Sequence, residues 1–371
     1  MDFKKYEKSK LAGDTLQNLS NMAIGLRDRA DLPLDVSLHE VANQELGTEY
    51  KDLDALLADV GIHRKVDTIS NLLTTQAGNA KWLVPEIMRS TIQLGMKRAP
   101  IYPNVIASEE SINAIKVQVP YINTMDAAPR WLGEGETIQL SELSYGSKEF
   151  KVRKMGRGIK LTDELRKFSS LNVVSMFLRD FGIRLGYGLD SLAIQVLLNG
   201  EQANGSQSAP VIGVATANTL TYKDILKVWL RLTRMGKNPT TMVGGEDMAL
   251  EILDLPEFKK SDKGVAPEAK LNLRTSVPSQ SDFFIHSSVP ASQVIILDES
   301  TTMGKFNTMP LKVEHERIVS NQTEATYVSL ATGFAIFFRD SRVALDKSVT
   351  YTNNPFPEYM NIDAMAVEVI K

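Results

Sequence analysis

The feature that most constrains the fold is a stretch from residue 170 to residue 199 that contains no proline and few polar side chains. Its apolar residues recur at intervals of three and four, which is the spacing of one face of an α-helix. At about 1.5 Å per residue, this helix would be roughly 45 Å long. Ser169 or Ser170 can cap its beginning, and Gly200 can end it. The residues expected to form its packing face include Phe177, Phe181, Leu185 and Leu189.

Three glycines, Gly182, Gly186 and Gly188, lie inside this predicted helix. Each weakens a helix by up to about 1 kcal/mol relative to alanine, so their presence needs a physical reason. Either they kink the helix or they allow another backbone to approach it closely. The sequence leaves both alternatives open.

Two alternating segments upstream of the helix predict a long two-stranded ribbon. Apolar and polar side chains alternate over residues 115–121 and again over residues 150–153. The polar stretch between them, residues 126–146, contains the acidic run GEGE at 133–136. Such a ribbon is marginally stable alone, so it must lie on another part of the chain or on another copy.

The remaining pattern predicts an α+β plan. Before the ribbon, short amphipathic helices are expected near residues 53–60 and 76–100, and residues 1–75 form a polar arm or a frayed terminus. Further helices are expected at 222–235 and 248–255. Strands are expected at 241–243, 283–286, 294–297, 311–315, 327–338, 348–351 and 364–370.

Composition excludes several classes of site. The chain has no cysteine, which removes disulfides, thiolate nucleophiles, iron–sulfur clusters and cysteine-ligated zinc, and it has four scattered histidines. No metal or cofactor is expected. No apolar run approaches the roughly 18 residues of a membrane-spanning helix, and the N-terminus lacks a secretory signal pattern, so we expect a cytosolic origin and no membrane contact. The net charge of -3 argues against a dedicated nucleic-acid binder.

A search for catalytic motifs finds none. No phosphate-binding loop, dinucleotide fingerprint, HExxH or GxSxG pattern is present. Glu134 and Glu136 could do acid–base chemistry, but on a polar loop they are expected to form a solvated acidic patch. His315 lies beside Glu314 and Glu316 and could act as a base, although an alternating strand with its polar face in water explains it as well.

A basic cluster follows the acidic run and is predicted on the second strand of the ribbon. Pairing with acidic residues of a neighbouring subunit and simple solvation are the two interpretations, because nucleic-acid binding would call for interleaved aromatic residues. The cluster consists of Lys148, Lys151, Arg153, Lys154, Arg157 and Lys160.

The order of these motifs resembles the major capsid proteins of tailed bacteriophages, a fold shared with encapsulins and the herpesvirus capsid floor. The resemblance covers roughly residues 76–371. Its motifs are WLGEGET (131–137), FKVRK (150–154), IKLTDEL (159–165), LNG (198–200), PVIGV (210–214), KVEHER (312–317) and ATGFAIFFR (331–339).

The resemblance implies a division of the chain. Residues 1–75 would be an N-terminal arm, 76–119 the start of a peripheral domain, 120–155 an extended loop, 156–214 the peripheral domain with its spine helix, 215–305 an axial domain, and 306–371 the return to the peripheral sheet. The extended loop would contact an adjacent subunit through Trp131, Glu134, Glu136, Lys148, Lys151 and Arg153. Some relatives crosslink a loop lysine to an asparagine. Lys148 with Asn353 or Asn354 lies in suitable regions, but no crosslink is predicted.

The resemblance also implies a function. The chain would self-assemble into hexamers and pentamers of an icosahedral shell that encloses double-stranded DNA without sequence-specific binding. Portal, scaffold and decoration proteins would be its partners. It would be located in the virion capsid after assembly in the bacterial cytoplasm. An encapsulin-like compartment is one alternative. An enzyme with carboxylates Glu134, Glu136 and Glu142 is another, and it requires a buried pocket around them.

Overall fold

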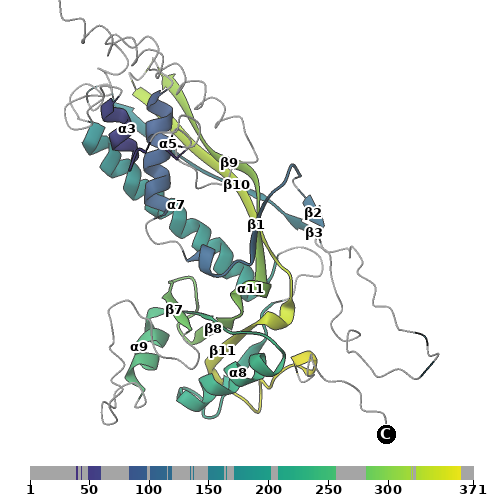
Figure 1. Ribbon diagram of the computed structural model, residues 1–371. Coiled ribbons are helices and arrows are strands. Elements are labelled where there is room, and N and C mark those ends of the chain that lie inside the picture. The colour runs from purple at the N-terminus through teal and green to yellow at the C-terminus, as the bar shows by residue number, and fades with distance from the viewer. Residues whose placement is uncertain are drawn as a thin grey trace, which may run out of the picture.

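The structure is a computed structural model of the 371-residue chain. It describes the following residues: 39–40, 43, 49–59, 83–97, 101–114, 116–118, 134, 137, 149–162, 164, 171–201, 208–255, 281–318, 320 and 323–360. Helices and strands are mixed throughout this part, so the α+β prediction is confirmed. Figure 1 shows an elongated arrangement in which a long sheet with its helices lies at one end and a second sheet lies at the other.

The first sheet has four strands in the order β1-β9-β10-β4. Its centre is a pair of long antiparallel strands, β9 (Met303–Ile318) and β10 (Thr323–Ile336). β4 (Arg153–Thr162) pairs antiparallel with β10 and forms one edge. β1 (Ser108–Ser111) pairs parallel with the first residues of β9 and forms the other edge.

Helix α7 (Leu171–Asn199) confirms the predicted long helix almost to the residue. It lies along the four-stranded sheet beside α5 (Leu83–Met96), as Figure 1 shows. Gly200 ends it in the left-handed region with φ of 71°, and its N–H donates to the carbonyl oxygen of Val196 at 2.8 Å. The short helix α3 (Leu53–Asp59) contributes Leu56 and Leu57 to the same buried core.

The glycines of α7 serve a close approach between helices. A Cβ added to Gly182 would lie 2.1 Å from the carbonyl oxygen of Ile92, and one added to Gly95 would lie 2.2 Å from that of Arg179. Gly186 lies against Met96, where an added Cβ would be 3.3 Å from the carbonyl oxygen. Close approach of another backbone, rather than a kink, therefore accounts for Gly182 and Gly186.

The second sheet has five strands in the order β5-β11-β8-β6-β7. Their bounds are β5 (Val211–Val214), β6 (Thr241–Gly244), β7 (Asp282–Ile285), β8 (Gln293–Leu297) and β11 (Arg342–Thr350). Helices α8 (Tyr222–Arg234) and α9 (Glu246–Asp254) contribute to the core on one face of this sheet. Asp224 completes a capping box at the start of α8 by accepting hydrogen bonds from Thr221.

Strand β8 divides its side chains between two cores. Val294 and Ile296 belong to the core with α8 and α9, whereas Ile295 and Leu297 belong to the core that contains α5 and α7. Successive side chains of a strand point to opposite faces of its sheet. One face of the five-stranded sheet therefore contributes to the core of α5 and α7, and the other face contributes to the core of α8 and α9.

The remaining described elements are short. The ribbon strands are β2 (Lys116–Gln118) and β3 (Glu149–Lys151). A four-residue helix, α11 (Glu299–Thr302), precedes β9, and single 3-10 turns are η1 (Tyr102–Asn104), η4 (Arg339–Ser341) and η5 (Glu358–Met360). The strand predicted at residues 364–370 and most of residues 1–75 lie outside the described residues.

The last described strand, β11, lies in a different sheet from the one expected from the sequence. Residues 306–371 were expected to return to the sheet of the spine helix, and β9 and β10 do lie in the four-stranded sheet. β11, however, pairs with β8 and β5 in the five-stranded sheet. A 3-10 turn at Arg339–Ser341 separates β10 from β11 and allows the chain to change sheets.

Within the described residues, α7 from Val173 to Asn199 is long and apolar enough to cross a membrane by length and composition, contrary to the expectation from the sequence. Half of its most apolar window is buried inside the protein. A buried core helix passes the same test, so this is weak evidence for a membrane span.

Candidate inter-subunit surface

The root of the ribbon is anchored in a small aromatic core. β2 and β3 pair antiparallel, with Val117 opposite Phe150. The Phe150 ring is buried and lies 4.9 Å from the ring of Phe306 between centroids. Val152 and Ala335 complete this core. The ribbon therefore leaves the four-stranded sheet from a fixed point on β9 and β10.

The loop that joins the two ribbon strands carries several of the predicted contact residues. Glu134 is exposed. Trp131, Glu136 and Lys148 lie outside the described residues, and so does Glu142 of the enzyme hypothesis. Because Glu134 is in contact with water, it is not in the buried pocket that acid–base catalysis by these carboxylates would require.

Most of the basic cluster lies on a different strand from the one predicted. Lys151 is on ribbon strand β3, but Arg153, Lys154, Arg157 and Lys160 belong to β4 and are exposed. The chain leaves the ribbon at Val152, which is buried in the aromatic core, and then enters the four-stranded sheet. The alternation of residues 150–153 continues across this transition, so the sequence pattern did not reveal it.

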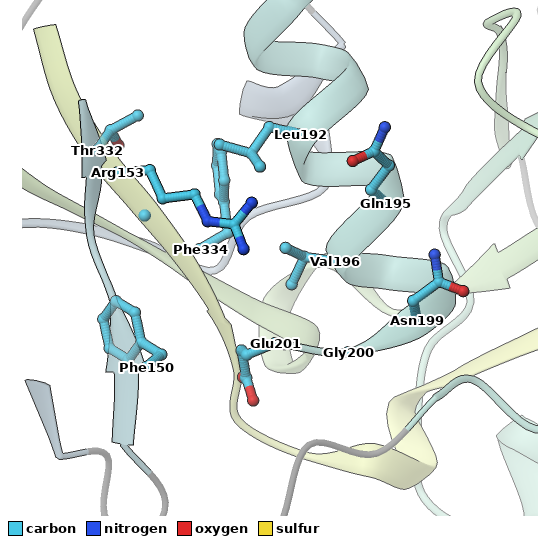
Figure 2. A pocket seen from close by; sticks show the side chains of 11 residues that line it. Phe150, Arg153, Leu192, Gln195, Val196, Asn199, Gly200, Glu201, Thr332 and Phe334 are labelled. Carbon is cyan, nitrogen blue, oxygen red and sulfur yellow. The ribbon is translucent and has the colours of Figure 1, made fainter. Parts of the chain in front are cut away.

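A small hollow lies between β3, β4, β10 and the C-terminal end of α7. Figure 2 shows Arg153 reaching from its strand toward the helix, with Leu192, Gln195, Val196 and Asn199 on the helix side. The other lining residues are Phe150, Gly200, Glu201, Thr332, Gly333 and Phe334. The hollow has a volume of about 80 Å³. Sites for small molecules usually measure about 300 Å³ or more, so this hollow is suited to water or one side chain.

The predicted packing face of the long helix is buried over most of its length. Phe181, Leu185 and Leu189 lie in the main core. Phe177 does not, because 67% of its surface is exposed. It lies one position before Leu178, and one residue turns a helix by about 100°. This rotation places Phe177 at the edge of the stripe formed by Val174, Leu178 and Phe181.

Asp190 is a buried carboxylate that connects α7 to the segment after α5. Its Oδ1 accepts hydrogen bonds from the backbone N–H groups of Ile101 at 2.9 Å and Tyr102 at 2.8 Å. Burial raises the pKa of Asp190 to about 6, although the two hydrogen bonds act in the opposite direction. The group has a structural role in this arrangement, since it holds the start of η1 against the helix.

Lys305 and Arg342 are two fully buried cations that no sequence pattern indicated. Lys305 donates to Glu109 Oε1 at 2.8 Å and lies over the ring of Tyr102 at 4.4 Å. Arg342 donates from Nε to the carbonyl oxygen of Leu197 at 2.7 Å, and burial lowers its pKa to about 10. Lys305 and Glu109 are 196 positions apart, so no local pattern could have indicated their contact.

The histidines and acidic residues give no sign of a metal site. No group of three or more His, Cys, Asp and Glu that could hold a metal ion occurs within the described residues. His286 is buried at the end of β7, stacks on Tyr187 at 4.1 Å between ring centroids, and has its pKa lowered by burial. His63 lies outside the described residues, and the side chain of His315 is not described.

Comparison with known families identifies the chain. A model of the family described as phage capsid protein matches residues 145–344, which is more than half of the sequence. The chain belongs to the phage capsid protein family. It is a structural major capsid protein of the tailed-phage type, and its place is the capsid of a virion. The resemblance noted from the motifs is thus confirmed.

Two solved capsid structures show the same fold at low sequence identity. The capsid of a native GTA particle has a TM-score of 0.50 at 12% identity, over 66% of this capsid protein and 89% of that chain. The mature capsid of bacteriophage PhiM1 also has a TM-score of 0.50, at 9% identity over 67% and 87%. An encapsulin from Synechococcus elongatus has a TM-score of 0.46 at 12% identity over 74% and 92%. No curated protein matches the chain.

Proposed function

We propose that this capsid protein assembles with copies of itself into the hexamers and pentamers of an icosahedral shell that encloses a phage double-stranded DNA genome. The observation that carries the proposal is the family match over residues 145–344, which includes ribbon strand β3, helix α7 and strands from both sheets. The shell would hold DNA without reading its sequence, and the chain would need no cofactor and catalyse no reaction.

The extended loop, residues 120–155, would lie over an adjacent subunit. Its support is physical: the ribbon is anchored at Phe150 on one side, and a two-stranded ribbon is marginal without a surface to cover. Trp131, Glu134 and Glu136 would make contacts from the loop. Lys148, Lys151 and Arg153 would make contacts near its root, where the hollow beside Arg153 can accept one side chain.

The remaining proposals concern organisation and partners. The proposed organisation keeps the residue ranges given for the arm, the peripheral domain and the axial domain, apart from β11, which pairs with β8 and β5. A portal protein, a scaffold protein and a decoration protein are the proposed partners, and assembly would occur in the bacterial cytoplasm before the shell is filled.

Electron microscopy of the purified full-length chain tests the main proposal. We expect closed shells or separate hexamers and pentamers, either from the chain alone or after co-expression with a scaffold protein. A chain that stays a folded monomer under all assembly conditions would contradict the proposal. Shells that form around an enzyme cargo, without DNA, would favour the encapsulin alternative.

A charge reversal tests the root of the extended loop. Arg153→Glu should lower the yield of assembled particles severalfold, because the positive charge beside the hollow would be replaced by a negative one. Arg153→Lys keeps the charge and is the matched control. Circular dichroism of the unassembled chains checks that both variants fold, and equal assembly of Arg153→Glu and wild type would refute a contact role for this residue.

A further inference from the structure

A buried histidine lies where the five-stranded sheet meets the long helix. His286 follows the last residue of β7, and its backbone N–H donates to the carbonyl oxygen of Gly244 on β6 at 2.9 Å. Only 2% of its surface is exposed, whereas the residue whose ring stacks on it, Tyr187 of α7, is 47% exposed. The imidazole is therefore buried at shallow depth, beneath a ring that water reaches.

The hydrogen bonds of His286 fix its charge state. The backbone N–H of Ser288 donates to Nδ1 at 3.1 Å, so Nδ1 is an acceptor and carries no proton. The ring is then the neutral tautomer with its proton on Nε2, which is buried without a well-formed hydrogen bond. A second proton can only go to Nδ1, where it would meet the N–H of Ser288. Protonation therefore breaks this hydrogen bond and places a positive charge inside the protein.

The turn that begins at His286, residues 286–289, is joined to α7 by two pairs of hydroxyl groups. The hydroxyl of Tyr187 forms a hydrogen bond with that of Ser287, and the hydroxyl oxygens of Ser191 and Ser288 are 2.7 Å apart. Tyr187 and Ser191 are four positions apart, so they lie on the same side of the helix. Ser288 takes part both in a contact with α7 and in the hydrogen bond to Nδ1, so a change at the imidazole reaches the contact with the helix directly.

Among the described residues, no charged side chain compensates a positive charge on His286. Burial lowers its pKa, and only the backbone of Tyr187 acts in the other direction. Strand β6 carries no charged residue. The charged residues closest along the chain to the other contacts of the turn are Arg184 and Asp190 on α7, Asp282 on β7, and Glu246 and Asp247 at the start of α9. None of these five side chains shifts the pKa of the imidazole, so a charged ring would lack a counterion.

We propose that His286 is a pH-dependent switch, whose neutral ring keeps the turn at residues 286–289 against α7 and whose protonation releases Ser287 and Ser288 from the helix. Val289 lies in the core of α5 and α7, so the release is confined to the turn. The turn is bound above about pH 6.5, the ordinary pKa of imidazole, and is released as the pH falls through the lowered pKa of the folded chain. The proposal concerns the single chain and goes beyond shell assembly, so it can hold or fail independently of the proposed function.

Hydrogen-exchange mass spectrometry of the full-length, unassembled chain measures the turn directly. Exchange in the peptide that contains residues 286–289 should become about tenfold faster between about pH 7.5 and pH 5, after correction for the intrinsic pH dependence of exchange. The reason is that an imidazole with its ordinary pKa, as in the released turn, is almost fully protonated at the lower pH. Peptides from α8 are the internal reference and should show no such change.

His286→Asn removes the titrating group, while the amide oxygen of asparagine can accept the hydrogen bond from Ser288 in place of Nδ1. This variant should exchange slowly in the turn at both pH values. His39→Asn removes a histidine outside the turn and is the matched control, which should behave as the wild type. An acid-induced increase of equal size in His286→Asn and wild type, or no increase in the wild type, would overturn the proposal.

A disulfide between the turn and α7 provides a second test that leaves His286 in place. Ser191→Cys with Ser288→Cys puts two thiols where the hydroxyl oxygens are 2.7 Å apart, and the chain has no other cysteine. The oxidised variant should lose the acid-induced increase in exchange, and reduction should restore it. An increase that persists in the oxidised variant would show that the turn does not separate from α7, contrary to the proposal. Exchange in the turn is the readout, because protonation of Asp190 stabilises the whole folded chain over the same pH range.

Discussion

The contact between α5 and α7 depends on Gly95 and Gly182, two residues that have no side chain. Gly182 faces the carbonyl oxygen of Ile92 so closely that an added Cβ would lie 2.1 Å from it, and backbone atoms cannot rotate away as a side chain can. Gly188, six residues later, faces only the side chain of Met155, whose sulfur would lie at an ordinary 3.5 Å from an added Cβ. The same residue type therefore has different roles within one helix.

Gly182→Ala should lower the free energy of unfolding by about 1 to 3 kcal/mol, because the two helices must separate to admit the methyl group. Gly188→Ala is the matched control and should be neutral or stabilising by up to about 1 kcal/mol, since alanine has the higher helix propensity. Urea unfolding of both variants measures the difference. Equal stabilities would mean that the close approach is not required for folding.

The buried carboxyl of Asp190 makes stability depend on pH. Its pKa in the folded chain is raised from 3.8 to about 6, so the folded state favours the protonated form. The stabilisation from this group is complete below about pH 4 and is lost as the pH rises through about 6. A shift of this size corresponds to about 3 kcal/mol between acidic and neutral pH.

Asp190→Asn should remove this contribution, because an amide cannot ionise while its oxygen can still accept the hydrogen bonds from Ile101 and Tyr102. The change in unfolding free energy between about pH 4 and pH 7 should become smaller in the variant. Asp180→Asn, at an exposed position, is the control. If Asp190→Asn and wild type show the same pH dependence, the carboxyl does not titrate in this range.

At the scale of elements, an ion pair between a fully buried lysine and a partly exposed glutamate ties strand β1 to strand β9. Lys305 is fully buried and donates to Glu109, which is 35% exposed and also accepts from Asn307 at 2.5 Å. Glu109→Gln should destabilise the protein by about 2 kcal/mol, because it leaves a buried ammonium group without its countercharge.

The adjacent, exposed Glu110 provides the control for this prediction. Glu110→Gln should change the free energy of unfolding by less than about 0.5 kcal/mol. The double variant Glu109→Gln with Lys305→Met should recover part of the lost stability, because both charges are then removed. A double variant less stable than Glu109→Gln alone would show that the lysine contributes through other contacts.

Elements with a strong local pattern were predictable from the sequence, and those defined by distant partners were not. The periodicity of α7 gave its bounds to within one residue, and alternation located both ribbon strands. The change from ribbon strand β3 to sheet strand β4 at Val152 leaves the alternation uninterrupted, so Arg153 and Lys154 were assigned to the wrong strand. The exposure of Phe177 was also missed, because a period of 3.6 leaves the edges of a stripe undetermined.

At the scale of the whole molecule, the two cores share a sheet. Ile295 faces the core of α5 and α7, and Ile296 faces the core of α8 and α9. We therefore expect the described parts of both units to unfold together. Ile296→Ala should cost about 2 to 5 kcal/mol and should accelerate amide hydrogen exchange in α7 as well as in α8.

Ile295→Ala is the reciprocal variant and should accelerate exchange in α8 as well as in α7. Hydrogen-exchange mass spectrometry resolves peptides from the two helices separately. If Ile296→Ala accelerated only the peptides of α8, the two units would be independent domains. Sequence alone could not indicate this coupling, because the assignment of β11 to the sheet of β8 depends on a pairing between strands about 45 residues apart.

The Gly95–Gly182 contact also has a mechanical consequence. Two helices that touch through their backbones have no layer of flexible side chains between them at that point, and sliding one past the other would bring a side chain against a carbonyl oxygen. The two helices therefore form one rigid unit that has a single packing register. Any rearrangement of the protein therefore moves α5 and α7 together.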